Sequence, residues 1–309
     1  MSAYAAAILI AQQNGYFKDA GVNVNVEVVG SVLTTTDVAA GRVDLAVTGA
    51  TSSFPPALQG HATEIVDELV PDSAFTSILV PYNSPIKSLM DLSGKKITVV
   101  GVGSATYGAV LAYSNYVTSH GGKPITPVPV TDATAQVSQV LSGQATAAIG
   151  LLDTYASYLG DNKVRVLNLG VDQASQAALN PSDVVGSVFW GLQTKIGSDS
   201  VGVSRFVAGI RRADTWLDHA SASQIASVLA GSPVIPASER ASISAQVPYD
   251  KPLYSASDGY ISAADWKTSL SAYASWHLPN INVNDDRLSY ANHVNMDFWN
   301  KATSLVNGS

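Results

Sequence analysis

The stretch AQQNGYFKDAG at residues 11–21 is followed at once by VNVNVEVV at residues 22–29, and AAGRVDLAVTG follows at residues 39–49. The first stretch ends an apolar helix at a glycine, and the alternation of apolar and polar residues after it predicts a half-buried strand. The third stretch ends another helix at Gly41 and leads directly into an apolar strand. This succession of helix, strand, helix and strand predicts an open α/β sheet.

These stretches resemble a motif pair of the extracytoplasmic solute-binding proteins of ABC importers for nitrate, sulfonates and taurine, the NMT1/THI5-like family. The family pattern is roughly A-x-x-x-G-Y-F-K-x-x-G-L-x-V-x, followed by G-x-V-D-x-A-V-x-G. KSLMDLSGKK at residues 87–96 is similar to the opening of the family's second lobe. The resemblance implies an α/β protein with the two-lobed periplasmic-binding-protein type II fold, or Venus flytrap. Each lobe would be a mixed sheet flanked by helices, with a helical C-terminal tail.

Two crossings between the lobes are expected. The strand pattern is interrupted by PYNSP at residues 81–85, because proline, asparagine and serine favour turns. The expected return is the apolar run VVGSVFW at residues 184–190. We therefore expect a discontinuous first lobe of residues 1–81 and 190–309, and an inserted second lobe of residues 82–189. The resemblance implies that the lobes close over a ligand in the cleft between them.

Composition excludes several classes of protein. At 309 residues, with 46% hydrophobic and only 13% charged residues, the chain can bury a large core. A net charge of −7 with scattered Lys and Arg argues against a nucleic-acid partner. The absence of cysteine excludes thiol nucleophiles, cysteine metal sites and disulfides. No apolar run reaches the roughly 18–20 residues of a transmembrane helix.

The beginning of the chain differs from the family pattern. The family places a strand before its first helix, whereas the helix here begins almost at Met1, and no basic region of an export signal precedes it. We expect that the start has been trimmed, together with any export signal and lipid anchor. The other interpretation is a sheet without its usual first strand. The resemblance implies a location in the periplasm or at the extracellular face of the membrane.

The turn GVGSATYG at residues 101–108 is the sharpest local feature. It imitates a dinucleotide fingerprint, but the G-x-G-x-x-G pattern requires a glycine where Thr106 stands. Free backbone N–H groups at the start of a helix favour an anion, and the hydroxyls of Ser104 and Thr106 add donors. Tyr107 offers an aromatic wall. In the other interpretation, Ser104 only caps its helix.

A matching turn is predicted in the first lobe. GATSS at residues 49–53 joins a buried strand to a helix and carries three hydroxyls, of which Thr51 and Ser52 are candidate anion donors. One of the three hydroxyls is expected to serve the helix cap. The resemblance implies a third turn near Ser2 and Tyr4, although these residues could also be a frayed terminus.

Two further residues are candidates for contact with a ligand. Asp153 follows the predicted strand at residues 147–151 and would bind an amine, as in taurine, or cap the next helix, which the sequence favours. Trp190, at the return crossing, would line an apolar part of the ligand or pack in the core.

Catalytic patterns are poor. The five histidines, His61, His120, His219, His277 and His293, show no metal-ligand spacing, and we expect them to be solvated. Neither H-E-x-x-H nor G-x-S-x-G occurs. We therefore expect no catalytic residue, no metal and no cofactor.

The residues and the resemblance together predict a solute-binding protein that captures a small organic anion. The favoured ligands are aliphatic sulfonates or taurine, with aromatic carboxylates or sulfonates second. The implied partners are an ABC permease and its ATPase subunits, and the protein would be a monomer that meets the membrane only through the permease or a lost lipid anchor. The alternatives are an enzyme on the same scaffold, as in thiamin-pyrimidine or menaquinone synthesis, and a ligand-binding sensor.

Overall fold

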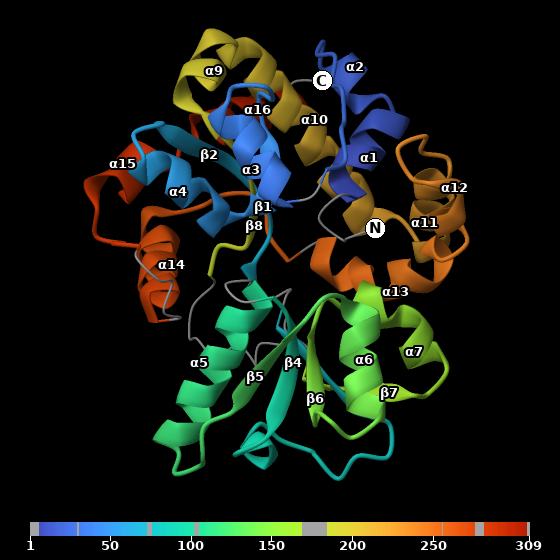
Figure 1. The fold of residues 1–309 in the computed structure, drawn as a ribbon. Coiled ribbons are helices and arrows are strands. Elements are labelled where there is room, and N and C mark those ends of the chain that lie inside the picture. The colour runs from blue at the N-terminus through green and yellow to red at the C-terminus, as the bar shows by residue number, and fades with distance from the viewer. Residues whose placement is uncertain are drawn as a thin grey trace. The chain divides into compact units, whose positions relative to one another are not determined.

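The fold was analysed in a computed structural model, shown in Figure 1. The structure describes residues 6–29, 31–72, 76–101, 105–168, 184–254, 256–275 and 281–307. The chain divides into two compact units. Unit 1 is Met1–Pro71, Val185–Lys267 and Ile281–Ser309, and unit 2 is Asp72–Val184 and Thr268–Asn280.

The boundaries of the units lie several residues before those expected at 81/82 and 189/190. Strand β3 (Ser77–Pro81) pairs with β6 and β7, so it belongs to the sheet of unit 2. Strand β8 (Ser187–Leu192) pairs with β1 and β2, so it belongs to the sheet of unit 1. The prolines at residues 81–85 therefore end a strand inside unit 2, and the pairing of strands decides where each unit begins.

Unit 1 is built on a sheet whose strands run in the order β1-β8-β2. β1 (Ala46–Gly49) and β2 (Thr63–Val70) both run antiparallel to β8, which lies between them. Phe189 and Trp190 of β8 are almost completely buried. Since β8 comes from a distant part of the sequence, the sheet of unit 1 is complete only when the chain returns from unit 2.

The strand predicted at residues 22–29 is wrong. Val22, Val24 and Val26 are half-buried and the polar residues between them are exposed, as the alternation indicates. Among the described residues, however, only Val22 of this segment has a backbone partner, the carbonyl of Phe17. In the described part of the chain, no strand pairs with this segment.

Helices surround the sheet of unit 1. The long helix α10 (Ser200–His219) begins at Asp199, whose side chain accepts a hydrogen bond from the N–H of Gly202. Its apolar face is buried, and Phe206 stacks on Phe17 of helix α2 at 5.2 Å between ring centroids. A Cβ at Gly209 would collide with the Phe17 ring, so the close approach of α2 requires glycine there.

The other helices that carry unit 1 residues are short or medium in length. They are α1 (Ala6–Gln13), α2 (Tyr16–Asp19), α3 (Ser31–Ala39), η2 (Ala50–Ser53), α4 (Phe54–Leu58), α9 (Gln193–Ser198), α11 (Ala222–Ala230), α12 (Ala237–Arg240), α13 (Ile243–Tyr254), α14 (Ala263–Ser275), η6 (Asp286–Leu288), α15 (Tyr290–His293) and α16 (Asp297–Asn307). The C-terminal part of the chain is helical, as predicted.

Unit 2 contains a mixed five-stranded sheet in the order β5-β4-β6-β3-β7. β4 runs parallel to β5 and β6, whereas β3 runs antiparallel to β6 and β7. Its remaining elements are η4 (Met90–Leu92), β4 (Lys96–Val100), α5 (Ala105–Ser119), β5 (Thr126–Val130), α6 (Ala133–Leu141), β6 (Ala147–Gly150), η5 (Leu152–Tyr155), α7 (Ala156–Gly160) and β7 (Val164–Asn168).

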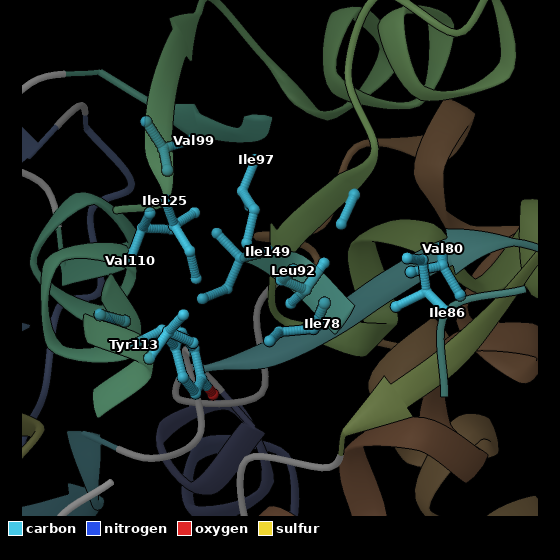
Figure 2. Close-up of a cluster of buried hydrophobic side chains, with 13 residues drawn as sticks. Ile78, Val80, Ile86, Leu92, Ile97, Val99, Val110, Tyr113, Ile125 and Ile149 are labelled. Carbon is cyan, nitrogen blue, oxygen red and sulfur yellow. The ribbon is translucent and has the colours of Figure 1, made fainter. Parts of the chain in front are cut away.

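The core of unit 2 lies between the sheet and α5. Figure 2 shows Ile78, Ile97 and Ile149 from three strands together with Val110 and Tyr113 of α5. The hydroxyl of Tyr113 donates a hydrogen bond to the carbonyl of Thr76 at 2.6 Å, so the only polar atom of this side chain is satisfied inside the core.

A buried ion network joins β2 to α10 in unit 1. Arg211 lies 3.3 Å from Asp67 Oδ1 and 3.2 Å from Asp214 Oδ2. Gly259 lies against the Arg211–Asp67 pair, and a Cβ at this position would collide with both side chains. Its φ of +83° also favours glycine. One guanidinium thus pairs with a fully buried carboxyl and with a mostly buried one. Burial raises the pKa of Asp67 and raises the pKa of Asp214 to about 7, against the opposing effect of Arg211.

The raised pKa of Asp214 predicts a stability that falls as pH rises. The folded chain holds this proton up to about pH 7, whereas an unfolded aspartate releases it near pH ~4. Between these values unfolding releases a proton, so the free energy of unfolding decreases by up to about 1.4 kcal/mol per pH unit. Urea unfolding at pH 5, 6, 7 and 8 measures this slope. In Asp214→Asn, which cannot ionise, the slope becomes shallower.

Asp285→Asn is the matched control for the pH experiment. Asp285 pairs with Arg287 on the surface, and its hydrogen bonds to Arg287 lower the pKa of its carboxyl to about 2. A lowered pKa contributes stability that is lost only in acid, below the window tested. This variant keeps the wild-type slope. Parallel curves for wild type and Asp214→Asn would show that Asp214 is already ionised at pH 5.

Candidate functional site

The candidate site of unit 1 is the turn Ala50–Ser53, the helix η2 that directly follows β1. The apolar strand ends at Gly49, and the prolines Pro55 and Pro56 stand at the first positions of α4, where a missing N–H costs nothing. The sequence therefore confines the turn to four residues between a buried strand and a helix start. Three of these four residues carry hydroxyls.

Both ends of the Ala50–Ser53 turn are fixed by hydrogen bonds. At the first end, the N–H of Ala50 donates to the carbonyl of Gly186 at 2.8 Å. At the other end, the hydroxyl of Thr63 donates to the carbonyl of Ser53 at 3.1 Å. Ser53 Oγ lies 2.7 Å from the carbonyl of Ala50, to which it donates, and 2.7 Å from His293 Nε2. Ser53 is fully buried, so its hydroxyl serves the structure.

The middle of the turn is different. Thr51 and Ser52 are half-buried, and within the described part of the chain neither hydroxyl has a hydrogen-bond partner. The space beside the Cα of Gly49 is open, with no heavy atom within 4 Å of an added Cβ. We expected one of the three hydroxyls to cap the helix, and this was wrong: Ser53 stands at the N-cap of α4 but makes no side-chain cap hydrogen bond, and its hydroxyl donates to the carbonyl of Ala50 instead. The other two can donate to a solute.

His293 is the residue that sequence reasoning missed. We expected it to be solvated, but its exposed fraction is 0%. Its ring packs edge-on against Phe54 and stacks on Trp266, with centroid distances of 5.5 and 5.6 Å. Burial lowers the pKa of His293 to about 4, against a smaller opposite effect of the Arg287 backbone, so the ring is neutral at pH 7.

Ser53 Oγ and His293 Nε2 share one hydrogen bond, so the two buried side chains fix each other's position.

The glycine-rich turn of unit 2 is described only in part. Ser104 lies outside the described residues, as do Ser2 and Tyr4. Thr106 is buried, and its hydroxyl accepts a hydrogen bond from the N–H of Val100 at 3.3 Å, which joins the end of β4 to the first turn of α5. Tyr107 is half-buried and packs against the core of unit 2.

Asp153 is almost completely buried at the start of η5. Its Oδ1 accepts hydrogen bonds from the N–H and the hydroxyl of Thr154, at 2.6 and 3.0 Å. Next to it, the hydroxyl of Tyr155 donates to Gln136, whose amide donates in turn to the carbonyl of Thr98 at 2.9 Å. Burial, and then the charge of Asp153, raise the pKa of Tyr155.

Trp190 is completely buried in unit 1. Its indole N–H donates to the hydroxyl of Thr48 at 2.7 Å, across the β1–β8 pair. This is a core position, which was the second interpretation left open by the sequence. The side chain ties the two strands together directly beside the Ala50–Ser53 turn.

Two kinds of site are not found among the described residues. No group of three or more His, Cys, Asp or Glu residues there could hold a metal ion. In the same parts of the chain, no helix has the length and apolar character needed to cross a bilayer.

Solved structures share the fold over nearly the whole chain. The alkanesulfonate-binding protein SsuA of Xanthomonas axonopodis pv. citri, bound to MOPS, is 19% identical, with a TM-score of 0.65 and 96% of each chain covered. The periplasmic aliphatic sulphonate-binding protein SsuA of Escherichia coli is 20% identical, with a TM-score of 0.67 over 88% of this chain and 83% of that one. The desulfurization enzyme DSZB is 15% identical, with a TM-score of 0.60 over 97% and 96%.

At these identities the likeness shows the fold alone. The predicted periplasmic-binding-protein fold is thereby confirmed. No curated protein sequence matches the chain significantly. A family model described as NMT1/THI5 like matches residues 2–217, more than half of the chain. The chain therefore belongs to the NMT1/THI5-like family.

Proposed function

We propose that the chain is the substrate-binding protein of an ABC importer and that it captures a small organic anion. An aliphatic sulfonate or taurine is the favoured ligand, and an aromatic carboxylate or sulfonate the second. The observation that carries the proposal is the Ala50–Ser53 turn, in which the hydroxyls of Thr51 and Ser52, between two anchored ends, have no partner among the described residues. Membership of the NMT1/THI5-like family and the sulfonate-binding SsuA structures support it.

Neutral donors suit this ligand class. A sulfonate is ionised at every physiological pH and spreads its charge over three oxygens, so several weak donors can hold it. Hydroxyls and the free N–H groups of a first helical turn provide such donors without burying a cation. Ser104, Ser2 and Tyr4 remain predicted contributors, and the protein would deliver its ligand to a permease and ATPase at the outer face of the membrane.

The ligand class can be tested by thermal shift with ethanesulfonate, taurine, benzenesulfonate and benzoate. A ligand present at a hundred times its Kd adds about 2.7 kcal/mol to stability, which raises the melting temperature measurably. The proposal predicts the largest shift with ethanesulfonate or taurine. A shift with the two aromatic anions alone would select the second ligand class, and no shift with any of the four would contradict the proposal.

Ser52→Ala should weaken the binding of ethanesulfonate about ten- to hundredfold. A hydrogen bond to a charged group contributes about 1.5–3 kcal/mol, and about 1.4 kcal/mol corresponds to a factor of ten in Kd. The half-buried hydroxyl has no described partner in the protein, so its loss should leave the melting temperature almost unchanged. Calorimetric titration and a melting curve on the same sample measure both quantities.

Ser221→Ala is the control for the Ser52 variant. Ser221 caps α11 with a capping box, in which its side chain accepts from the N–H of Gln224. Its removal costs about 1 kcal/mol of stability and should leave Kd unchanged. If Ser52→Ala binds ethanesulfonate as tightly as wild type does, the Ser52 hydroxyl is not part of the binding site.

The similarity to the desulfurization enzyme DSZB favours a second candidate, an enzyme on the same scaffold. The two candidates differ in what happens to the ligand. A binding protein returns ethanesulfonate or benzenesulfonate unchanged after a day of incubation, as mass spectrometry and sulfite detection would show. Product in excess of the protein concentration would establish the enzyme instead.

A further inference from the structure

The hydrogen bond between Ser53 and His293 joins residues that lie 240 positions apart in the sequence. Both side chains are fully buried, and Ser53 Oγ lies 2.7 Å from His293 Nε2. α15, which ends at His293, is thereby fastened to the last residue of the Ala50–Ser53 turn. Hydrophobic side chains could fill this buried space without a hydrogen bond. The presence of a polar pair there therefore points to a role in the conformation of the Ala50–Ser53 turn.

We propose that His293 is a positioning residue for ligand capture, because its bond to Ser53 keeps the hydroxyls of Thr51 and Ser52 free for the ligand. This inference rests on the proposed function and adds to it a residue that does not itself touch the ligand. The expected consequence is that loss of the imidazole weakens binding although the ligand contacts remain in place.

Serine and threonine hydroxyls readily bond to nearby backbone groups, and such local bonds offer a turn several alternative conformations. In the Ala50–Ser53 turn only Ser53 makes this bond, to the carbonyl of Ala50. His293 Nε2 bonds to the same oxygen and so helps to hold the Ser53 side chain where it reaches Ala50. Thr51 and Ser52 are left without an internal role.

Packing against Phe54 and Trp266 restricts rotation of the His293 ring. Phe54 lies edge-on to the ring, with 72° between the planes, and Trp266 stacks on it with 24°. Trp266 is fixed in turn, since its indole N–H donates to the carbonyl of Leu288 at 2.8 Å. A hydrogen-bonding group on a packed ring helps to hold its partner within the roughly 0.5 Å that a preorganised binding turn requires.

Three variants separate positioning from general stability. His293→Phe keeps an aromatic ring between Phe54 and Trp266 but loses the hydrogen bond to Ser53. His293→Gln keeps a hydrogen-bonding amide at nearly the position of Nε2. Tyr113→Phe, in the core of unit 2, is the matched control, because it also removes a buried hydrogen bond of an aromatic side chain.

The first measurement needs no ligand. In His293→Phe, peptides covering residues 46–58 should exchange their amide hydrogens faster than in wild type, whereas peptides of α6 should not change. In the control variant the 46–58 peptides exchange as in wild type. Unchanged exchange of these peptides in His293→Phe would overturn the inference, whatever the ligand proves to be.

The second measurement is calorimetric titration with ethanesulfonate. His293→Phe should raise Kd about three- to tenfold, which corresponds to the loss of one buried hydrogen bond. His293→Gln should recover most of this loss, and Tyr113→Phe should keep the wild-type Kd at a similarly reduced melting temperature. Wild-type affinity in His293→Phe would overturn the inference. Faster exchange in this variant, together with no binding by wild type, would keep the positioning role and reject only the proposed ligand.

Discussion

The hydrogen bond from the N–H of Ala50 to the carbonyl of Gly186 is the contact on which the architecture of unit 1 depends. It continues the pairing of β1 with β8 by one residue beyond Gly49, at the point where the chain has just returned from unit 2. On the other side of β8, the carboxylate of Glu68 accepts a hydrogen bond from the N–H of Gly186 at 3.0 Å. The returning strand and the candidate binding turn are therefore held through the same residue, Gly186.

This arrangement separates the residues that build the turn from those that can meet a ligand. Ala50 and Ser53 are buried and bonded to β8 and α15, whereas Thr51 and Ser52 are half-buried with unpartnered hydroxyls in the described structure. A turn anchored in this way loses little conformational entropy when it binds, because most of the ordering has occurred on folding.

Much of the fold could be predicted from the sequence because its signals are local. The helix of residues 200–219 has a strong apolar period, and the strands of unit 2 are short apolar runs between glycines and helices. The sequence-based predictions failed where the structure of a segment depends on residues far away in the chain. The alternation at residues 22–29 is real, but no described strand lies beside it. His293 looked solvated because its burial depends on Ser53, Phe54 and Trp266, which no spacing in the sequence connects to it.

The central claim, that the middle of the anchored turn binds the anion, is tested most directly by a crystal structure with bound ethanesulfonate. The account predicts a sulfonate oxygen about 2.5–3.0 Å from the hydroxyl of Ser52 or Thr51. In that complex Ser53 keeps its bonds to Ala50 and His293. A sulfonate bound elsewhere, with both hydroxyls still facing water, would contradict the account.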